Sequence, residues 1–307
     1  MSKINYSIII PTRNLTDLLR RCLDSIPHRS DVQIIVVDDN SDPSIVDFKH
    51  YPGLNEPCTE VIFTKEGKGA GYARNVGLNH AVGELIIFMD SDDYFLLSIN
   101  KVLDDYINTE YDIVYFYTQN VDTDTYLMSE HTRGCNNYVR DFKNNKPNSE
   151  INLRINFHTP WAKIYRKSLI DTYNIKFDET FKANDVHFGY KTGYYAKKIY
   201  ADDRAVYCLT NRAGSLSTIY SPEACVIISE VYCDCLLFLK EKGLKSNSVF
   251  WYTYQGVINM LVKLKKENSN KYIQVFDKLA DVGVSKIRIN IDVICRSIKN
   301  AIKKALT

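Results

Sequence analysis

The chain has 307 residues, of which 45% are hydrophobic and 25% are charged, and its formal net charge is +2. This composition is typical of a globular protein with ample material for a core, and the length predicts about two domains or one large α/β domain with an appendage. A net charge so close to zero gives no reason to expect nucleic acid as a partner.

The first 120 residues alternate short apolar runs with helical patterns. The apolar runs predict strands within residues 7–12, 32–42, 59–65, 84–90 and 111–119, of which the second ends in acidic residues. Apolar residues spaced by three and four positions predict a helix between residues 15 and 26, and a second helix follows the glycines of 67–71 and ends at Gly83. Strands that alternate with helices and are apolar on both faces are typical of a doubly wound α/β domain with a mostly parallel sheet.

The pattern is weaker after residue 120. Residues 132–150 are polar and are predicted to form a loop, residues 160–179 contain a short helix, and residues 204–212 read as a strand. From Ser221 to the end the spacing is helical. We therefore predict a domain at 1–220 and a C-terminal α-helical region at 221–307.

The last predicted helix has two unlike faces. One stripe carries Ile287, Ile291, Ile294, Ile298 and Ile302. The helix also contains six basic residues and a single acidic residue, Asp292. Such a helix is suited to lie on an anionic membrane surface. The alternatives are that it packs on the body of the protein or on a second subunit in a homodimer.

Other features bear on the class of protein. No stretch approaches the roughly 18 apolar residues of a membrane span. Residues 1–14 lack the length and cleavage site of a signal peptide, so we expect a cytoplasmic protein, with any membrane contact peripheral and at the inner face. The eight cysteines include no C-x-x-C pair and have mostly apolar neighbours, which predicts small buried side chains rather than a zinc site or a disulfide framework.

Four segments are predicted to meet at one edge of the sheet, because the carboxyl ends of parallel strands share an edge. Such sheets bind ligands at that edge. They are residues 8–14 (IIIPTRN), 36–42 (VVDDNSD), 67–75 (GKGAGYARN) and 88–93 (FMDSDD). Carboxylate oxygens suit Mg²⁺ or Mn²⁺, which often share them with a diphosphate. The acidic cluster alone favours a solvated turn in which an Asp caps the next helix, but its convergence with the other segments favours a metal.

Over about residues 5–218 this joint pattern resembles the family 2 glycosyltransferases, which have the GT-A fold. A Rossmann dehydrogenase fits poorly, since the glycines read G-x-G-x-G and follow the third strand. The resemblance implies an inverting, metal-dependent transferase that moves a sugar from a UDP-sugar to a hydroxyl of a saccharide or lipid-linked saccharide, as in bacterial capsule or lipopolysaccharide synthesis. It also implies a nucleotide-sugar-binding half at 1–120 and an acceptor half at 121–220.

The resemblance implies the donor-binding residues by motif position. The donor-binding set comprises Pro11, Thr12, Arg13, Asn14, Asp39, Gly71, Arg74, Asp90, Ser91, Asp92 and Arg212. Within it, Asp39 is expected to accept the uracil N–H, because a carboxylate is only an acceptor. Asp92 is expected to ligate Mn²⁺ or Mg²⁺, and Arg212 to reach the diphosphate. For Asp38 and Asp93, structural or capping roles are the alternative.

The second half is implied to supply the catalytic base. In residues 181–190 (FKANDVHFGY), Asp185 matches the family's base, while Asn184 stands where the family usually has an acidic residue. The alternative for Asp185 is a cap on the helix that follows it. Trp161 and His187 are tentative acceptor contacts, and their alternatives are core packing and a structural histidine.

Two other functions stay open. A sugar nucleotidyltransferase also uses metal carboxylates on a similar sheet, but it opens with a glycine-rich loop after the first strand, and residues 8–19 contain no glycine. A catalytically silent protein that binds a nucleotide-sugar or another protein would keep the fold. Asn184 is the feature that favours this second alternative.

Overall fold

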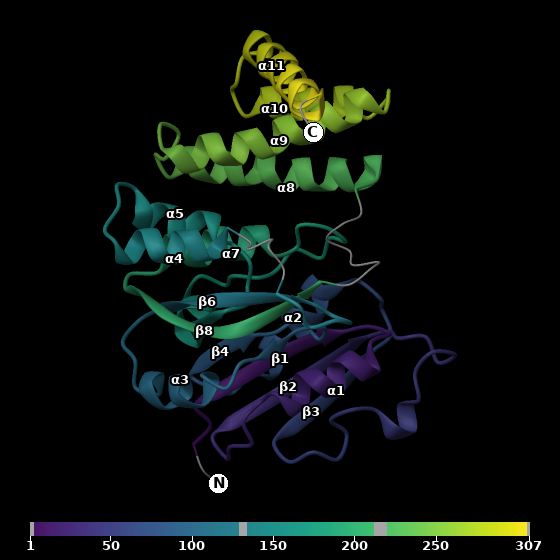
Figure 1. Ribbon diagram of the computed structural model, residues 1–307, viewed down its shortest axis with the longest axis vertical. Coiled ribbons are helices and arrows are strands. Elements are labelled where there is room, and N and C mark those ends of the chain that lie inside the picture. The colour runs from purple at the N-terminus through teal and green to yellow at the C-terminus, as the bar shows by residue number, and fades with distance from the viewer. Residues whose placement is uncertain (1–2, 129–133, 212–219, 306–307) are drawn as a thin grey trace. The chain divides into compact units, whose positions relative to one another are not determined.

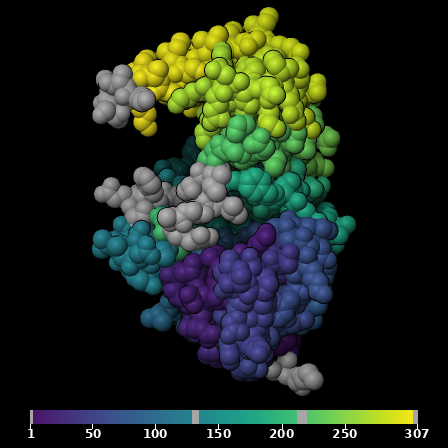
Figure 2. Space-filling view, turned by 90° about the vertical axis from the view of Figure 1, so that its right-hand side faces the viewer, coloured from purple at the N-terminus to yellow at the C-terminus, as the bar shows by residue number. Residues whose placement is uncertain are grey.

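The computed structural model describes residues 3–128, 134–211 and 220–305. The chain divides into two compact units. The larger unit holds residues 3–180 and 187–211, and the smaller holds residues 181–186 and 220–305. Within the larger unit, the first hundred residues form one continuous body, coloured purple to blue in the space-filling view (Figure 2).

The larger unit is built on one mixed sheet of eight strands in the order β3-β2-β1-β4-β7-β6-β8-β5 (Figure 1). The strands are β1 (Tyr6–Thr12), β2 (Val32–Asp39), β3 (Thr59–Thr64), β4 (Leu85–Phe88), β5 (Tyr94–Phe95), β6 (Ile113–Asp122), β7 (Lys163–Arg166) and β8 (Ile199–Asn211). Strands β1 to β4 pair in parallel, as do β6 and β8, whereas β7 runs antiparallel to β4 and β6. The predicted α/β class is confirmed. Strands β5 and β7 are absent from the prediction because two and four residues are too few for a recognisable pattern.

Helices flank this sheet. They are α1 (Thr16–Asp24), α2 (Ala70–His80), α3 (Ile99–Tyr106), α4 (Cys135–Lys143), α5 (Ser149–Asn156), α6 (Lys167–Thr172) and α7 (Val186–Tyr195), with a short 3₁₀ helix, η1 (Phe48–His50). The prediction of a loop over residues 132–150 is wrong, because α4 and the start of α5 lie there. Helix α4 buries only Cys135 and Val139. So few apolar positions give a weak periodic signal, and packing against α5 and β6 stabilises the helix instead.

Two glycines let α2 and the segment after it lie close to β1. A Cβ atom on Gly77 would come within 2.4 Å of a methyl carbon of Ile9, and one on Gly83 within 2.6 Å of the backbone nitrogen of Ser7. A larger side chain at either position would push the two elements apart. Residues 67–69, here called the glycine loop, directly precede α2. The close packing of α2 on β1 positions this loop at the carboxyl edge of the sheet.

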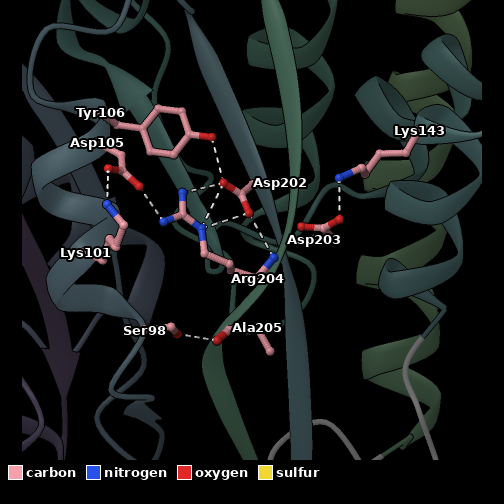
Figure 3. Close-up of polar contacts among 9 residues, drawn as sticks. All are labelled: Ser98, Lys101, Asp105, Tyr106, Lys143, Asp202, Asp203, Arg204 and Ala205. Carbon is pink, nitrogen blue, oxygen red and sulfur yellow. Dashed lines mark hydrogen bonds and ion pairs between the residues drawn. The ribbon is translucent and has the colours of Figure 1, made fainter.

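A bulge in β8 is fastened to α3. The guanidinium of Arg204 forms ion pairs with Asp202 at 2.6 Å and with Asp105 at 2.6 Å, and the Tyr106 hydroxyl donates to Asp202 at 2.8 Å (Figure 3). The pairing of β8 with β6 shifts register at this point. The network therefore fixes the start of β8 against α3, the helix that follows the acidic turn (residues 90–93).

The smaller unit is helical. It contains α8 (Pro222–Glu241), α9 (Ser248–Lys266), α10 (Tyr272–Asp281) and α11 (Lys286–Ala305), where the sequence predicts helices. The Ser221 side chain accepts a hydrogen bond from the Ala224 nitrogen and Pro222 occupies the first turn, which is a favourable start for α8. No helix in the described ranges is long and apolar enough to cross a membrane.

Six of the eight cysteines are buried, but Cys58 and Cys295 are exposed. The prediction of buried cysteines is wrong for these two. Cys58 lies in the turn before β3 with a φ of 63°, and Cys295 lies on an exposed side of α11. The exposure of these two cysteines could not be predicted from the identity of the neighbouring residues.

Candidate functional site

Strand β2 ends in two adjacent carboxylates, of which Asp38 serves the fold. Asp38 accepts hydrogen bonds from the Ser41 nitrogen at 2.8 Å, the Ser41 hydroxyl at 2.5 Å and the Tyr51 hydroxyl at 2.6 Å. The Ser41 hydroxyl in turn accepts from the Asn14 nitrogen at 2.7 Å. These contacts use both oxygens of Asp38 to hold the turn after β2 against the segment after β1. They support the structural alternative for Asp38.

The second carboxylate, Asp39, orders the glycine loop. It accepts hydrogen bonds from the Gly69 nitrogen at 2.6 Å and the Lys68 nitrogen at 3.1 Å. Gly69 has a φ of 96°, a backbone conformation that favours glycine. Asp39 is thus an acceptor, and the donors it meets here are these two backbone N–H groups and, at 3.4 Å, the Thr64 hydroxyl.

The remaining predicted donor residues of the first half lie around this loop. Pro11 and Thr12 are buried at the end of β1, whereas Arg13 is exposed and reaches toward Gly67. Asn14 has a φ of 57°, and its side chain accepts a hydrogen bond from the Asp42 nitrogen at 2.7 Å. Gly71 is buried in the first turn of α2. The structure therefore brings the ends of β1 and β2 together with the glycine loop.

Arg74 and Asp90 form an ion pair at the acidic turn. One Nη atom of Arg74 lies 2.5 Å from Oδ1 of Asp90, and the side chains are 7% and 31% exposed. The Arg74 guanidinium also stands over the ring of Phe177 at 5.3 Å. Arg74 is therefore a partly desolvated cation that offsets part of the negative charge of the turn.

Asp93 ties the acidic turn to β8. Its carboxylate accepts from the Thr210 nitrogen at 2.7 Å and from the Tyr207 hydroxyl at 2.8 Å, and that hydroxyl accepts from the Asp90 nitrogen at 2.9 Å. Burial, followed by the charges of Asp92 and Asp90, raises the pKa of Asp93 well above its ordinary value, although the two hydrogen bonds act in the opposite direction. These contacts support the structural alternative for Asp93.

Asp92, the predicted metal ligand, is half-buried and its backbone is held from two sides. Its carbonyl oxygen accepts hydrogen bonds from the guanidinium of Arg21 and from the hydroxyl of Thr210. Arg21 lies over the rings of Tyr94 and Tyr126, at 5.3 and 6.0 Å. Sequence reasoning missed the contacts of Arg21 and Tyr207 with this turn, because each meets it from a distant part of the chain.

The described residues could hold a metal ion only together with the phosphates of a substrate. Within residues 3–128, 134–211 and 220–305, no group of three or more His, Cys, Asp or Glu side chains could hold a metal ion by itself. Mg²⁺ and Mn²⁺ are, however, commonly bound by one or two carboxylates together with substrate phosphates. Asp92 and Asp90 are both half-buried at the sheet edge and fit that mode.

The predicted base, Asp185, directly precedes α7 and belongs to the smaller unit. Asp185 is half-buried there. The pKa of Tyr232 in α8 is raised above the ordinary tyrosine value, chiefly by the burial of Tyr232 and next by the charge of Asp185. Sequence reasoning missed this electrostatic influence, which acts between residues 47 positions apart. Arg212, the predicted diphosphate contact, lies outside the residues that the structure describes.

The two tentative acceptor residues lie in the larger unit. Trp161 is 3% exposed and stacks on Tyr207, with ring centroids 5.6 Å apart and planes 10° apart. His187 is half-buried, and its Nδ1 lies 2.6 Å from Oδ2 of Asp178. Both contacts support the structural alternatives, and acceptor binding by Trp161 and His187 stays a prediction.

Comparison with known proteins gives consistent matches. Residues 7–173 match the family described as glycosyl transferase family 2. The glycosyltransferase GlyA of Streptococcus pneumoniae is 25% identical over 253 residues, which cover 77% of this chain and 35% of GlyA. The poly(ribitol-phosphate) beta-N-acetylglucosaminyltransferase TarS of Staphylococcus aureus is 30% identical over 230 residues, which cover 72% of this chain and 38% of TarS. The chain thus spans little more than a third of the length of these curated relatives.

Two solved structures share the fold. Residues 1–349 of S. aureus TarS, in complex with UDP-GlcNAc, superpose with a TM-score of 0.62 and 21% identity, covering 98% of this chain and 92% of that one. The mannosyltransferase PcManGT from Pyrobaculum calidifontis, in complex with GDP-Man and Mn²⁺, superposes with a TM-score of 0.53 and 15% identity, covering 98% and 88%. At these identities the likeness concerns the fold alone, and it confirms the predicted GT-A architecture.

Proposed function

The chain belongs to glycosyl transferase family 2, and from this premise we propose that it moves a sugar from a UDP-sugar to a hydroxyl of a saccharide or lipid-linked saccharide, with inversion. The observation that carries the proposal is the convergence of the glycine loop and the acidic turn at one sheet edge, where Asp39 orders the loop and Arg74 pairs with Asp90. TarS bound to UDP-GlcNAc and PcManGT bound to GDP-Man support a nucleotide-sugar as the donor.

The proposed nucleotide site uses residues that the fold already holds in place. A carboxylate offers about four lone-pair positions. Asp39 uses two of them for bonds to the loop and a third for the Thr64 hydroxyl at 3.4 Å. The remaining position would accept the uracil N–H. The exposed Arg13, next to Gly67, is suited to contact the base or a phosphate.

The proposed diphosphate site is the acidic turn. Asp92 would hold Mn²⁺ or Mg²⁺ with Asp90 beside it, and the bound cation would neutralise charge that develops on the departing nucleotide. Arg74 holds the carboxylate of Asp90, and Arg21 holds the backbone of Asp92. These contacts fix the carboxylate of Asp90 and the backbone of Asp92, and fixed charges are what electrostatic catalysis uses.

Asp185 is proposed as the general base. It would take the proton of an acceptor hydroxyl while the hydroxyl oxygen attacks the anomeric carbon on the face opposite the nucleotide. A single displacement of this kind inverts the configuration, and the leaving diphosphate departs from the other face. The support is the match of Asp185 to the family's base position and its half-buried place at the start of α7.

The acceptor is proposed from the relatives. TarS acts on poly(ribitol-phosphate), and EpsJ of Bacillus subtilis, described as an uncharacterized glycosyltransferase, is 27% identical over 250 residues. These relatives are bacterial and support an acceptor of the polysaccharide type. Assignment to capsule or lipopolysaccharide synthesis is a narrower form of the same proposal.

A two-step measurement tests the function. Thermal shift with Mn²⁺ across UDP-GlcNAc, UDP-glucose, UDP-galactose and GDP-mannose should identify the donor that raises the melting temperature, because binding to the folded state stabilises it. The best donor, without acceptor, should then release free nucleotide slowly by hydrolysis.

Nucleotide release separates the first alternative from the proposed transfer, and an assay for pyrophosphate separates the second. A silent binding protein would be stabilised by the donor but would release no nucleotide. A sugar nucleotidyltransferase would instead form pyrophosphate from a nucleoside triphosphate and a sugar phosphate. Either result would contradict the proposed transfer.

A further inference from the structure

Helix α11 of the smaller unit has two apolar faces, and only one of them is covered within the described residues. The covered face carries Ile289 and Val293, which are 0% and 1% exposed. It packs on α9, where the Tyr254 hydroxyl donates to Asp292 at 2.8 Å and Arg296 donates to Gln255 at 2.5 Å. This face therefore accounts for how α11 attaches to its unit.

The opposite face carries a continuous isoleucine stripe. Its members are 50% to 75% exposed: Ile287, Ile291, Ile294, Ile298 and Ile302. At about 100° of rotation per residue, the five side chains fall within an arc of about 80°. The centre of this arc points away from Ile289 and Val293. The yellow residues of α11 lie at the surface of the smaller unit in Figure 2. An apolar stripe this long marks an interaction surface, whereas a single exposed isoleucine would not.

Positive charge is concentrated on the same helix. Residues 286–305 contain six basic residues and one acidic residue, a net charge of +5, whereas the whole chain carries +2. All other residues together are therefore net negative. Two of the basic side chains form exposed ion pairs, Lys286 with Asp277 and Arg288 with Asp292, and such pairs are weak enough to be exchanged for other anions.

An aromatic side chain lies beside the start of the stripe. The guanidinium of Arg288 stands 5.5 Å from the ring centroid of Trp251 in α9. Trp251 is 39% exposed. Tryptophan and tyrosine are enriched where protein meets the boundary between lipid and water, because their rings are apolar and their edges polar.

We propose that the isoleucine stripe of α11 lies on the surface of an anionic phospholipid bilayer, with the helix in the plane of the interface. The exposed isoleucines would enter the boundary of the acyl chains. Arg288 and Lys299, about 80° and about 100° around the helix from the centre of the stripe, would meet anionic head groups. A second copy of this chain fits less well, because a symmetric pairing would bring two helices of net charge +5 together. Binding to lipid does not depend on the proposed sugar transfer.

Vesicle flotation with the full chain tests this surface. We expect the wild-type chain to float with vesicles of phosphatidylcholine that contain about one third phosphatidylglycerol, to bind pure phosphatidylcholine weakly, and to be released as salt rises, since salt screens charge. Ile294→Gln/Ile298→Gln should reduce the bound fraction about tenfold, because it removes apolar area from the centre of the stripe. The matched control, Ile45→Gln/Val82→Gln, changes two exposed residues of the larger unit and should bind as wild type.

Three results would overturn the proposal. They are no flotation of the wild-type chain with anionic vesicles, unchanged flotation of Ile294→Gln/Ile298→Gln, or a wild-type dimer that this variant converts to a monomer without any vesicle binding. Sedimentation velocity measures the last of these. Circular dichroism should show unchanged helix content in the variant, and its nucleotide release should equal that of wild type. That release assay distinguishes failure of this surface from failure of the proposed function.

Discussion

The guanidinium of Arg74 lies 2.5 Å from the carboxylate of Asp90, and this contact joins the start of α2 to the turn after β4. Three aspartates lie in that turn, and like charges so close together oppose one another's ionisation. Arg74 supplies one nearby positive charge, and Arg21 supplies another at the backbone of Asp92. The turn is therefore partly neutralised by the protein itself, before any cation is considered.

Removal of this pair should weaken both the donor site and the fold. We expect Arg74→Met to lower the free energy of unfolding by about 2 kcal/mol, because it removes a hydrogen bond between charged groups and leaves Asp90 with less compensation. Donor affinity should fall about tenfold, as Asp90 loses its fixed orientation. Urea unfolding and calorimetry with the donor measure the two effects. The control Arg140→Met removes an exposed arginine of α4 and should alter neither; full donor affinity in Arg74→Met would contradict the role of the pair.

Asp185→Asn should remove transfer while it leaves the donor bound. An amide cannot accept the proton of the acceptor hydroxyl, so we expect kcat to fall about 10²- to 10⁴-fold. Donor affinity should change less than about twofold, as the proposed role concerns only the acceptor. Initial rates and calorimetry measure the two quantities. Asp203→Asn, at an exposed aspartate paired with Lys143, is the matched control. Transfer at the wild-type rate in Asp185→Asn would sink the assignment of the base.

Asp92→Asn should uncouple donor binding from the metal. In the wild-type chain, Mn²⁺ should tighten binding of the donor, because cation and diphosphate share one site. In the variant, we expect calorimetric titrations with Mn²⁺ and with a chelator to give nearly equal affinities. Asp124→Asn, at an exposed aspartate of the hairpin after β6, should behave as wild type. If Mn²⁺ leaves the affinity of the wild-type chain unchanged, the metal role of Asp92 is wrong.

The buried Asp93 should make stability depend on pH. Its pKa in the folded chain is raised well above the ordinary value of 3.8, chiefly by burial. The folded state therefore holds the proton more tightly than the unfolded state. The contribution of Asp93 to stability is full below the ordinary pKa and is lost as pH rises through the raised one. We expect Asp93→Asn to flatten this part of the profile, as measured by urea unfolding at a series of pH values. An unchanged slope in the variant would show that another group is responsible.

The central strands, and the sheet edge where the glycine loop and the acidic turn meet, could be predicted from the amino-acid sequence alone. Strands β1, β2 and β4 are buried on both faces, so they must be continuous apolar runs, and such runs are visible without a structure. The polar residues that follow them must then share one sheet edge. The glycine loop and the acidic turn were predicted to meet for this reason, and the same residues carried the resemblance to the family.

The contacts between individual side chains could not be predicted in this way, because they depend on how distant segments pack. Asp38 and Asp39 are adjacent, yet they act on different segments. Asp38 bonds to Ser41 and Tyr51, which lie between β2 and β3, whereas Asp39 bonds to Gly69 in the glycine loop after β3. Arg21 and Tyr207 reach the acidic turn from 71 and 114 positions away. Contacts of such separation leave no local pattern in the sequence, since they arise from packing of the whole sheet. The exposed isoleucine stripe of α11 is the converse case, because its period was visible in the sequence but its exposure required the packing of Ile289 and Val293 to be known.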